Sequence, residues 1–165
     1  MKSRARIGIL LAGLAASSGC AALAPAFTES DRAAVADSVR AFAAAYLADV
    51  NGGGFDRVLT HFADEPGFLF LENGRIAYDS HAAVAQAFDG MSGVVAEIRM
   101  TVDDSRVVVL APGTAIVSAL YNQVFVDTEG NEFEIDGAFT LVAVHRSDGW
   151  KWLTGHTSQP VPRPE

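Results

Sequence analysis

The chain has 165 residues, half of them hydrophobic, which is enough for one globular domain with a core of its own. Its net charge of −8 repels a phosphate backbone, and no basic stripe interrupts the acidic sequence, so we expect no nucleic-acid partner. Cys20 is the only cysteine, which excludes an intrachain disulfide and a thiolate metal cluster.

Residues 1–19 have the layout of a secretory signal peptide, with basic residues, then an apolar run too short to span a bilayer, then small residues. Ser17-Ser18-Gly19-Cys20 resembles the lipobox of bacterial lipoproteins, with Ser17 where Leu is usual. We therefore expect an exported protein of the cell envelope that meets the membrane only through a lipid on Cys20. Ordinary cleavage near residues 24–26, giving a periplasmic or secreted protein, is the alternative.

The rest of the chain divides into three predicted segments. Residues 20–29 are a linker, residues 30–158 form the folded domain, and the Pro-rich residues 159–165 are a disordered tail. The sequence contains no internal repeat and no sign of a second domain.

Helices come first within the domain. Thr28 and Asp31 have the spacing of a capping pair, and apolar residues then recur at helical spacing over residues 31–49, where a run of glycines ends the helix. Residues 55–62 predict a short second helix. Residues 80–90 predict a third one, which begins at a capping Asp or Ser and stops at a glycine.

Strands make up the remainder. Asn73-Gly74 is a strong hairpin signal between short strands at 68–72 and 75–78. From residue 95 onward the pattern is β, with turn residues between strands at 95–102, 106–110, 114–126, 132–146 and 150–158. Helices followed by an antiparallel meander indicate an α+β domain in which the N-terminal helices pack on one face of a curved antiparallel sheet.

Gly-containing loops at 128–130 and 147–149 set the predicted register of the last three strands, because Gly takes positive φ in a three-residue hairpin loop. The expected pairs are Asn122 with Asp136, Ser118 with Thr140, and Thr140 with His156. These polar side chains then share one face with Trp150 and Trp152. Because that face is otherwise apolar, we interpret it as a pocket wall turned toward the helices. Tyr121 and Phe139 then belong to the opposite, outer face.

The order of the predicted helices and strands, together with several short sequence motifs, resembles the nuclear transport factor 2-like superfamily, especially its polyketide-cyclase SnoaL-like branch. The resemblance lies in Tyr46 near the end of the first helix and in the motifs His61-Phe62-Ala63-Asp64, Asp148-Gly149-Trp150-Lys151-Trp152 and His156-Thr157-Ser158. The resemblance covers residues 30–158. It implies a cone-shaped domain with a pocket between helices and bent sheet, and a homodimer formed through the outer sheet face.

His156 and Asp136 are the candidate catalytic pair, because a carboxylate near an imidazole in a dry pocket gives a general base or acid. The resemblance implies a cofactor-free isomerase, dehydratase or cyclase acting on a small apolar or aromatic molecule. Tyr46 or Asn122 would steady a developing oxyanion. The other predicted pocket residues are Ser118, Thr140, Trp152 and Ser158.

Other interpretations remain open from the sequence. A buried His bonded to Thr or Asp is an ordinary core group, and the aromatic residues at these spacings are ordinary packing residues. The domain would then be a small-molecule binder without catalysis, or a non-catalytic dimerisation or protein-interaction module. We expect no metal site, because no pair of histidines has the close helical spacing of a ligand motif. Nucleotide-binding and nucleophile-elbow motifs are also absent from the sequence, so we expect no cofactor.

Overall fold

The computed structural model describes residues 26–160, so the predicted signal peptide, Cys20 and residues 161–165 of the predicted tail lie outside it. Helix α1 (Glu29–Asn51) begins at the predicted capping box. The backbone N–H of Asp31 donates to Thr28 Oγ1 at 3.2 Å, and the backbone N–H of Thr28 donates to Asp31 Oδ2 at 2.9 Å. The prediction for this helix is therefore confirmed, because its start depends on local chemistry.

Two shorter helices follow. Helix α2 (Phe55–Leu59) ends earlier than predicted, and helix α3 (His81–Ser92) starts after Ser80, whose Oγ accepts from the Ala83 backbone N–H at 3.3 Å. Among the described helices, none combines the length and the hydrophobicity needed to cross a membrane.

Strands β1 (Leu69–Glu72) and β2 (Arg75–Tyr78) form the predicted hairpin. Its two turn residues both have left-handed backbone angles, with φ of 49° at Asn73 and 79° at Gly74. This conformation suits a two-residue turn between twisted antiparallel strands, and Asn and Gly tolerate it best.

The long strands are β3 (Val95–Ala111), β4 (Thr114–Asp127), β5 (Glu132–Arg146) and β6 (Gly149–Ser158). The prediction of two strands between residues 95 and 110 is wrong, since β3 is continuous. Its pairing with β4 shifts between Asp103 and Arg106, and Asp104 has φ of 50°. The polar residues that looked like a turn form a bulge, which bends the strand without ending it.

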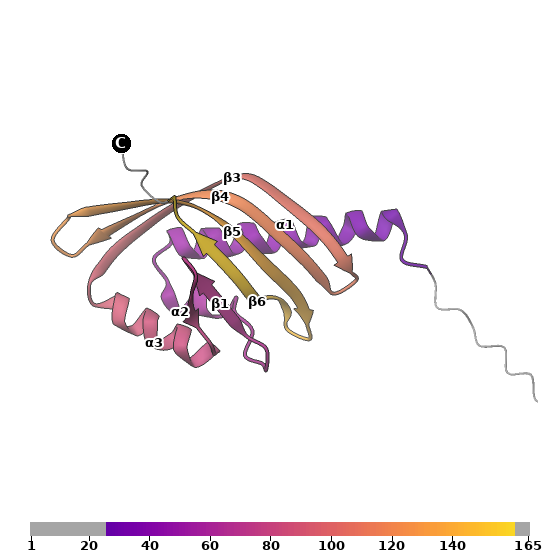
Figure 1. Ribbon diagram of the computed structural model, residues 1–165, viewed down its shortest axis with the longest axis horizontal. Helices are drawn as coiled ribbons and strands as arrows, with labels where there is room; N and C mark the ends of the chain where they lie inside the picture. The colour runs from indigo at the N-terminus through magenta and orange to yellow at the C-terminus, as the bar shows by residue number, and fades with distance from the viewer. Residues whose placement is uncertain (1–25, 161–165) are drawn as a thin grey trace, which may run out of the picture.

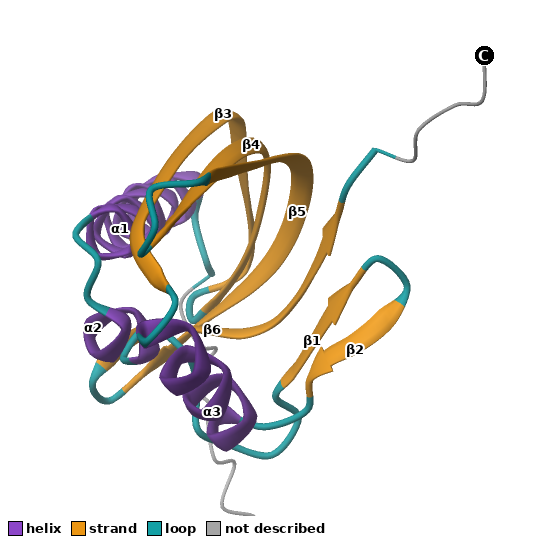
Figure 2. Cartoon of the chain, turned by 90° about the vertical axis from the view of Figure 1, so that its left-hand side faces the viewer, coloured by secondary structure: helices purple, strands orange, loops and turns teal. Residues whose placement is uncertain are grey.

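The six strands form one sheet in the order β2-β1-β6-β5-β4-β3. All neighbours are antiparallel except β1 and β6, which run parallel, so the sheet is mixed where an antiparallel one was predicted. Figure 1 shows α1 running beneath the bent long strands, and Figure 2 shows how strongly they curl. Side-chain amide and guanidinium groups join α1 to β3: Asn51 Nδ2 donates to Met100 O at 3.0 Å, and Arg32 Nη1 to Val109 O at 3.1 Å.

The core lies between the helices and the inner face of this sheet. Val39 of α1, Val84 of α3, Val117 of β4 and Trp152 of β6 are each at most 1% exposed. Leu120, on the opposite face of the same sheet, is 52% exposed. The inner face is therefore the one that carries Val117, and the fold is the predicted α+β arrangement of helices on a curved sheet.

The predicted register of the meander is confirmed for Asn122 with Asp136, Ser118 with Thr140, and Thr140 with His156. The last loop differs, because Arg146 pairs with Gly149 instead of Trp150. Val142 pairs with Thr154 but Ala143 pairs with Trp152, so Leu153 is an extra residue in β6. This bulge interrupts the alternation of side chains, and Trp152 therefore lies on the inner face while His156 lies on the outer one.

Candidate functional site

A cavity of about 350 Å³ lies between the inner face of the sheet, the three helices and the β1–β2 hairpin. Most of its wall is aromatic or aliphatic. The aromatic lining residues are Tyr46, Phe55, Phe62, Phe70, Tyr78, Phe88, Tyr121, Phe125, Phe139 and Trp152. Its size and its apolar lining are those of a small-molecule pocket.

All three tyrosines of the chain line this cavity. Burial, and to a lesser degree the neighbouring Tyr78, raises the pKa of Tyr46 to about 12. Burial also raises the pKa values of Tyr78 and Tyr121, and the negative charge of Glu72 adds to both shifts. The three phenols are therefore protonated at neutral pH and present O–H donors, with one carboxylate close to two of them.

Among the lining side chains that carry a polar atom, Trp152 is the most deeply buried. It is 1% exposed, and its Nε1–H has no hydrogen-bond partner among the residues of the structure. Leaving such a donor unpaired costs about 1–3 kcal/mol, so native proteins rarely do so without a reason. An acceptor oxygen on a bound molecule would remove that penalty.

The position of Trp152 is fixed by two backbone hydrogen bonds along one edge of its strand and by packing of its ring on α1. Its backbone N–H donates to His61 O at 2.7 Å, and its carbonyl accepts from the Ala63 backbone N–H at 2.9 Å. Its indole packs against Phe42 and Tyr46 of α1, with ring centroids 4.7 Å and 5.9 Å away. The segment after α2 thus behaves as a short extra strand beside β6, and it holds the indole against the helix.

Two of the residues predicted for the pocket, Tyr46 and Trp152, lie in the cavity wall. The prediction that His156 and Asp136 face the helices is wrong, because both are exposed on the outer face. Ser118, Asn122 and Thr140 also lie on the outer face, where Thr140 is exposed and the other two are half-buried. They alternate along their strands with the inward residues Val117, Tyr121 and Leu141. Tyr121 and Phe139, predicted for the outer face, are inside.

Hydrogen bonds on the outer face join several of the predicted residues to one another. Ser118 Oγ lies 3.1 Å from Thr140 Oγ1, and Asn122 Nδ2 donates to Glu134 Oε1 at 2.6 Å and to Asp136 Oδ1 at 3.0 Å. Ser158 lines an open surface depression together with Asn122 and Asp136. The predicted residues therefore gather as expected from the register, but on the solvent side of the sheet.

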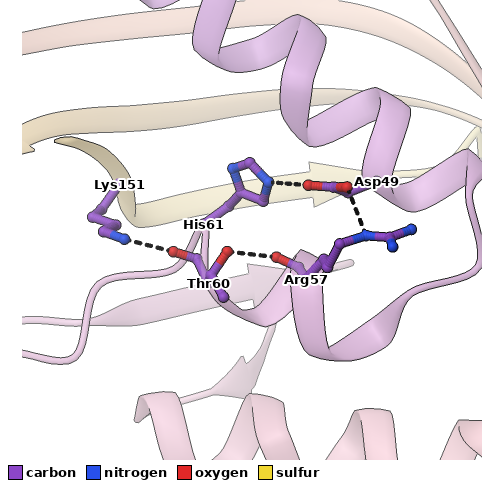
Figure 3. A network of polar contacts seen from close by, with 5 residues as sticks. All are labelled: Asp49, Arg57, Thr60, His61 and Lys151. Atoms are coloured by element: carbon purple, nitrogen blue, oxygen red, sulfur yellow. Dashed lines mark hydrogen bonds and ion pairs between the residues drawn. The ribbon is translucent and has the colours of Figure 1, made fainter. Parts of the chain in front are cut away.

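A His–Asp pair that the sequence reasoning missed connects α1 to the segment after α2 (Figure 3). His61 Nε2 lies 2.8 Å from Asp49 Oδ2, and Arg57 Nε donates to Asp49 Oδ1 at 3.0 Å. The hydrogen bond to His61 lowers the pKa of Asp49, and the hydrogen bond from Arg57 lowers it further by a smaller amount. The His61 ring packs against Phe42 and Tyr46.

Neither member of this pair is a lining residue of the cavity, so we interpret it as a contact that positions the two helices. Twelve residues separate His61 from Asp49, and neither helical nor strand periodicity relates such positions. In the sequence, His61 stood out only as part of the motif His61-Phe62-Ala63-Asp64, which indicated the fold and not a contact with Asp49. Between residues 26 and 160, no group of three or more His, Cys, Asp or Glu could hold a metal ion.

Comparison with solved structures shows the same fold in proteins of very different sequence. A nuclear transport factor 2-like superfamily protein from Salmonella enterica has a TM-score of 0.68 at 16% identity, covering 80% of this chain and 95% of that one. A protein from Novosphingobium aromaticivorans assigned as a scytalone dehydratase has a TM-score of 0.73 at 9% identity, covering 81% and 89%. The type 2 hexachlorocyclohexane dehydrochlorinase LinA has a TM-score of 0.65 at 12% identity, covering 81% and 90%.

Comparison with curated protein sequences found no match. The model of one protein family, described as the SnoaL-like domain, matches residues 39–162. These residues include most of α1, the whole sheet and every aromatic residue of the cavity wall. The chain therefore belongs to the SnoaL-like domain family.

Proposed function

We propose that this domain binds a small, largely apolar or aromatic molecule in the cavity between its helices and its bent sheet. The observation that carries the proposal is a cavity whose wall is mainly aromatic and holds few polar groups, among them an unpaired indole N–H and protonated phenols. Apolar walls supply the affinity in such pockets, and a few placed donors fix the orientation of the ligand.

A cofactor-free isomerase, dehydratase or cyclase reaction is the enzymatic form of this proposal. Two proteins of similar fold are named as a dehydratase and a dehydrochlorinase, and both names describe eliminations. Glu72 is the carboxylate among the lining residues, so it replaces Asp136 and His156 as the candidate general base. A carbonyl next to the acidic C–H would accept a hydrogen bond from a tyrosine O–H as negative charge develops on it.

Neighbouring residues of β2 provide a matched test of binding. Ala77 lines the cavity, whereas Ile76 is 65% exposed. We expect naphthol to bind the native protein and the Ile76→Phe variant with similar affinity, and Ala77→Phe to lose binding because the added ring occupies the cavity. Calorimetry or quenching of tryptophan fluorescence measures this. Equal binding to all three proteins would place naphthol elsewhere and contradict the proposal.

Replacing Glu72 with Gln separates catalysis from binding. Because the amide keeps the shape of the side chain but cannot take a proton, we expect naphthol affinity to persist while any proton transfer from a ketone substrate stops. Exchange of the ketone α-protons with deuterated water, followed by NMR, measures the reaction. Exchange that continues unchanged in Glu72→Gln would exclude Glu72 as the base.

A second candidate function is a dimerisation or interaction module that uses the outer sheet face. Val108, Leu110 and Leu120 are 54%, 53% and 52% exposed there, and an apolar group of this kind often marks an interface. We propose Leu120→Asp in place of changes at Tyr121 or Phe139, which line the cavity. Sedimentation should show a native homodimer that Leu120→Asp splits, and a native monomer would exclude the homodimer.

Export and lipidation on Cys20 also remain our proposals, since they concern residues outside the described range. Mass spectrometry of the mature protein from cells would find a lipidated Cys20 at its N-terminus. A mature chain that begins near residues 24–26 would instead indicate ordinary cleavage.

A further inference from the structure

A second cavity of about 280 Å³ lies on the other side of Trp152, between α1 and the sheet. On the helix it is lined by Ala43 and Leu47, and on the sheet by valines such as Val107 and Val117. Ala43 and Ala44 have short side chains, so α1 fills little of this space. Arg40, Ala44 and Ser105 among its lining residues are exposed, so this cavity opens to solvent at its rim.

One layer of side chains separates the two cavities. Five residues line both of them: Tyr46, Met100, Phe139, Leu141 and Trp152. Met100 is unbranched and adapts its shape easily, so it is the most deformable side chain of this partition. The two spaces are therefore neighbours across a deformable wall.

The partition also contains the unpaired donor. Trp152 belongs to both walls, and its Nε1–H has no partner among residues 26–160. At the far rim, the Arg40 guanidinium is already paired with Asp37, with Nη1 2.6 Å from Oδ1. The second cavity thus offers mainly apolar contacts, and the wall that it shares with the first carries the Trp152 N–H and the Tyr46 phenol.

We propose that the two cavities are compartments of one binding site for an elongated, mainly apolar molecule with an acceptor oxygen near its middle. The inference rests on the proposed binding function and adds the shape and class of the ligand. The aromatic compartment holds one end, Trp152 Nε1 donates to the oxygen, and an aliphatic tail occupies the compartment beside Ala43. Each cavity alone is near the lower limit for ligand pockets, whereas a ligand that crosses the partition uses both.

Straight-chain methyl ketones of increasing length test the second compartment. Each methylene that enters it should tighten binding by about fourfold, as expected for burial of one methylene, until the compartment is full. Ala43→Leu fills the compartment, whereas Ala45→Leu adds the same side chain on the exposed side of the helix. We expect Ala43→Leu to abolish the gain for long ketones and leave short ketones unchanged, with Ala45→Leu behaving like the native protein.

Two results would distinguish this inference from the proposed function. If naphthol binds but ketone length has no effect, or if Ala43→Leu binds long ketones as tightly as Ala45→Leu does, the second compartment is not used and the inference is overturned. If neither naphthol nor any ketone binds, the proposed function itself fails, and the inference fails with it.

The donor is tested by comparing each ketone with the alkane of equal length. Trp152→Phe removes the N–H but keeps an aromatic ring, so we expect the preference for ketone over alkane to fall about tenfold in this variant. The ratio is taken within one protein, which cancels a general loss of affinity. A native protein that binds alkane as tightly as ketone would overturn the role of Trp152, whether or not the variant folds.

Discussion

Both faces of the bent sheet carry apolar side chains, but the polar groups on the two faces differ in their hydrogen bonding. On the outer face, Ser118 is bonded to Thr140, and Asn122 is bonded to two carboxylates. On the inner side, the Trp152 indole N–H has no partner within the described structure, and three phenols stand in an aromatic wall. Paired polar groups stabilise a surface, whereas an enclosed unpaired donor is available to a ligand.

The two faces should differ most in the loss of folding stability that follows truncation of an apolar side chain. We expect Trp152→Ala to lower the free energy of unfolding by roughly 3–5 kcal/mol, because it leaves a cavity in the core. Val108→Ala, on the half-exposed outer face, should change it by less than about 1 kcal/mol. Urea denaturation at low protein concentration measures both. Similar losses for the two variants would mean that the outer face is as well packed as the inner one.

Gly137 marks a place where the inner face has no room. A Cβ there would lie 2.6 Å from both the Ser158 carbonyl oxygen and Tyr121 Cζ, and the backbone oxygen cannot move aside easily. We expect Gly137→Ala to destabilise the protein by about 1–3 kcal/mol. Gly90→Ala is the control, because its Cβ meets open space in a helix and should stabilise by about 0.5–1 kcal/mol. A neutral Gly137→Ala would show that the strands can separate there.

Titration of the tyrosines reports on the inner face alone, since all three line the cavity. The pKa of Tyr46 is about 12, against roughly 10 for an unfolded chain, so between these values the unfolded state has released a proton that the folded state keeps. Stability must therefore fall as the pH rises through this window. We expect Tyr46→Phe to weaken this alkaline loss. A difference in phenolate absorbance between the native protein and Tyr46→Phe that already appears at pH 10 would contradict the buried position of Tyr46.

The smallest expected changes in folding stability concern His61 and His156. His61 is 12% exposed and bonded to Asp49, so His61→Gln should cost about 0.5–1.5 kcal/mol of folding stability. His156 is exposed, and His156→Gln should change stability by less than about 0.5 kcal/mol and leave naphthol binding unaltered. Loss of ligand binding in His156→Gln would reopen a role for the outer face.

Local signals predicted most of the fold. Thr28 with Asp31, and Asn73 with Gly74, mark their helix start and turn correctly, because capping and positive φ depend on a few neighbouring residues. Less local features were missed. The bulge at Asp104 was read as a turn, and the parallel pairing of β1 with β6 left no sign in either strand.

The candidate site was predicted only in part. Tyr46 and Trp152 lie in the cavity wall, but Trp152 was assigned to the same face as His156. The assignment failed because Leu153 is an extra residue that shifts every side chain after it to the other face. Glu72, Tyr78 and Tyr121 were missed as cavity residues, because they come from strands whose inward faces depend on the position of the helices.

The sequence by itself determined the order of the helices, the cap of α1, the turn at Asn73-Gly74, and the polar pairs across the meander such as Thr140 with His156. Each of these follows from backbone preferences and alternation over a few residues. Only the tertiary structure decided which face of the sheet is inside. Both faces are apolar enough to be buried, and the choice depends on where α1 packs and on a single bulge. The cavity exists for the same reason, since it is the space that a bent sheet and an alanine-containing helix leave between them.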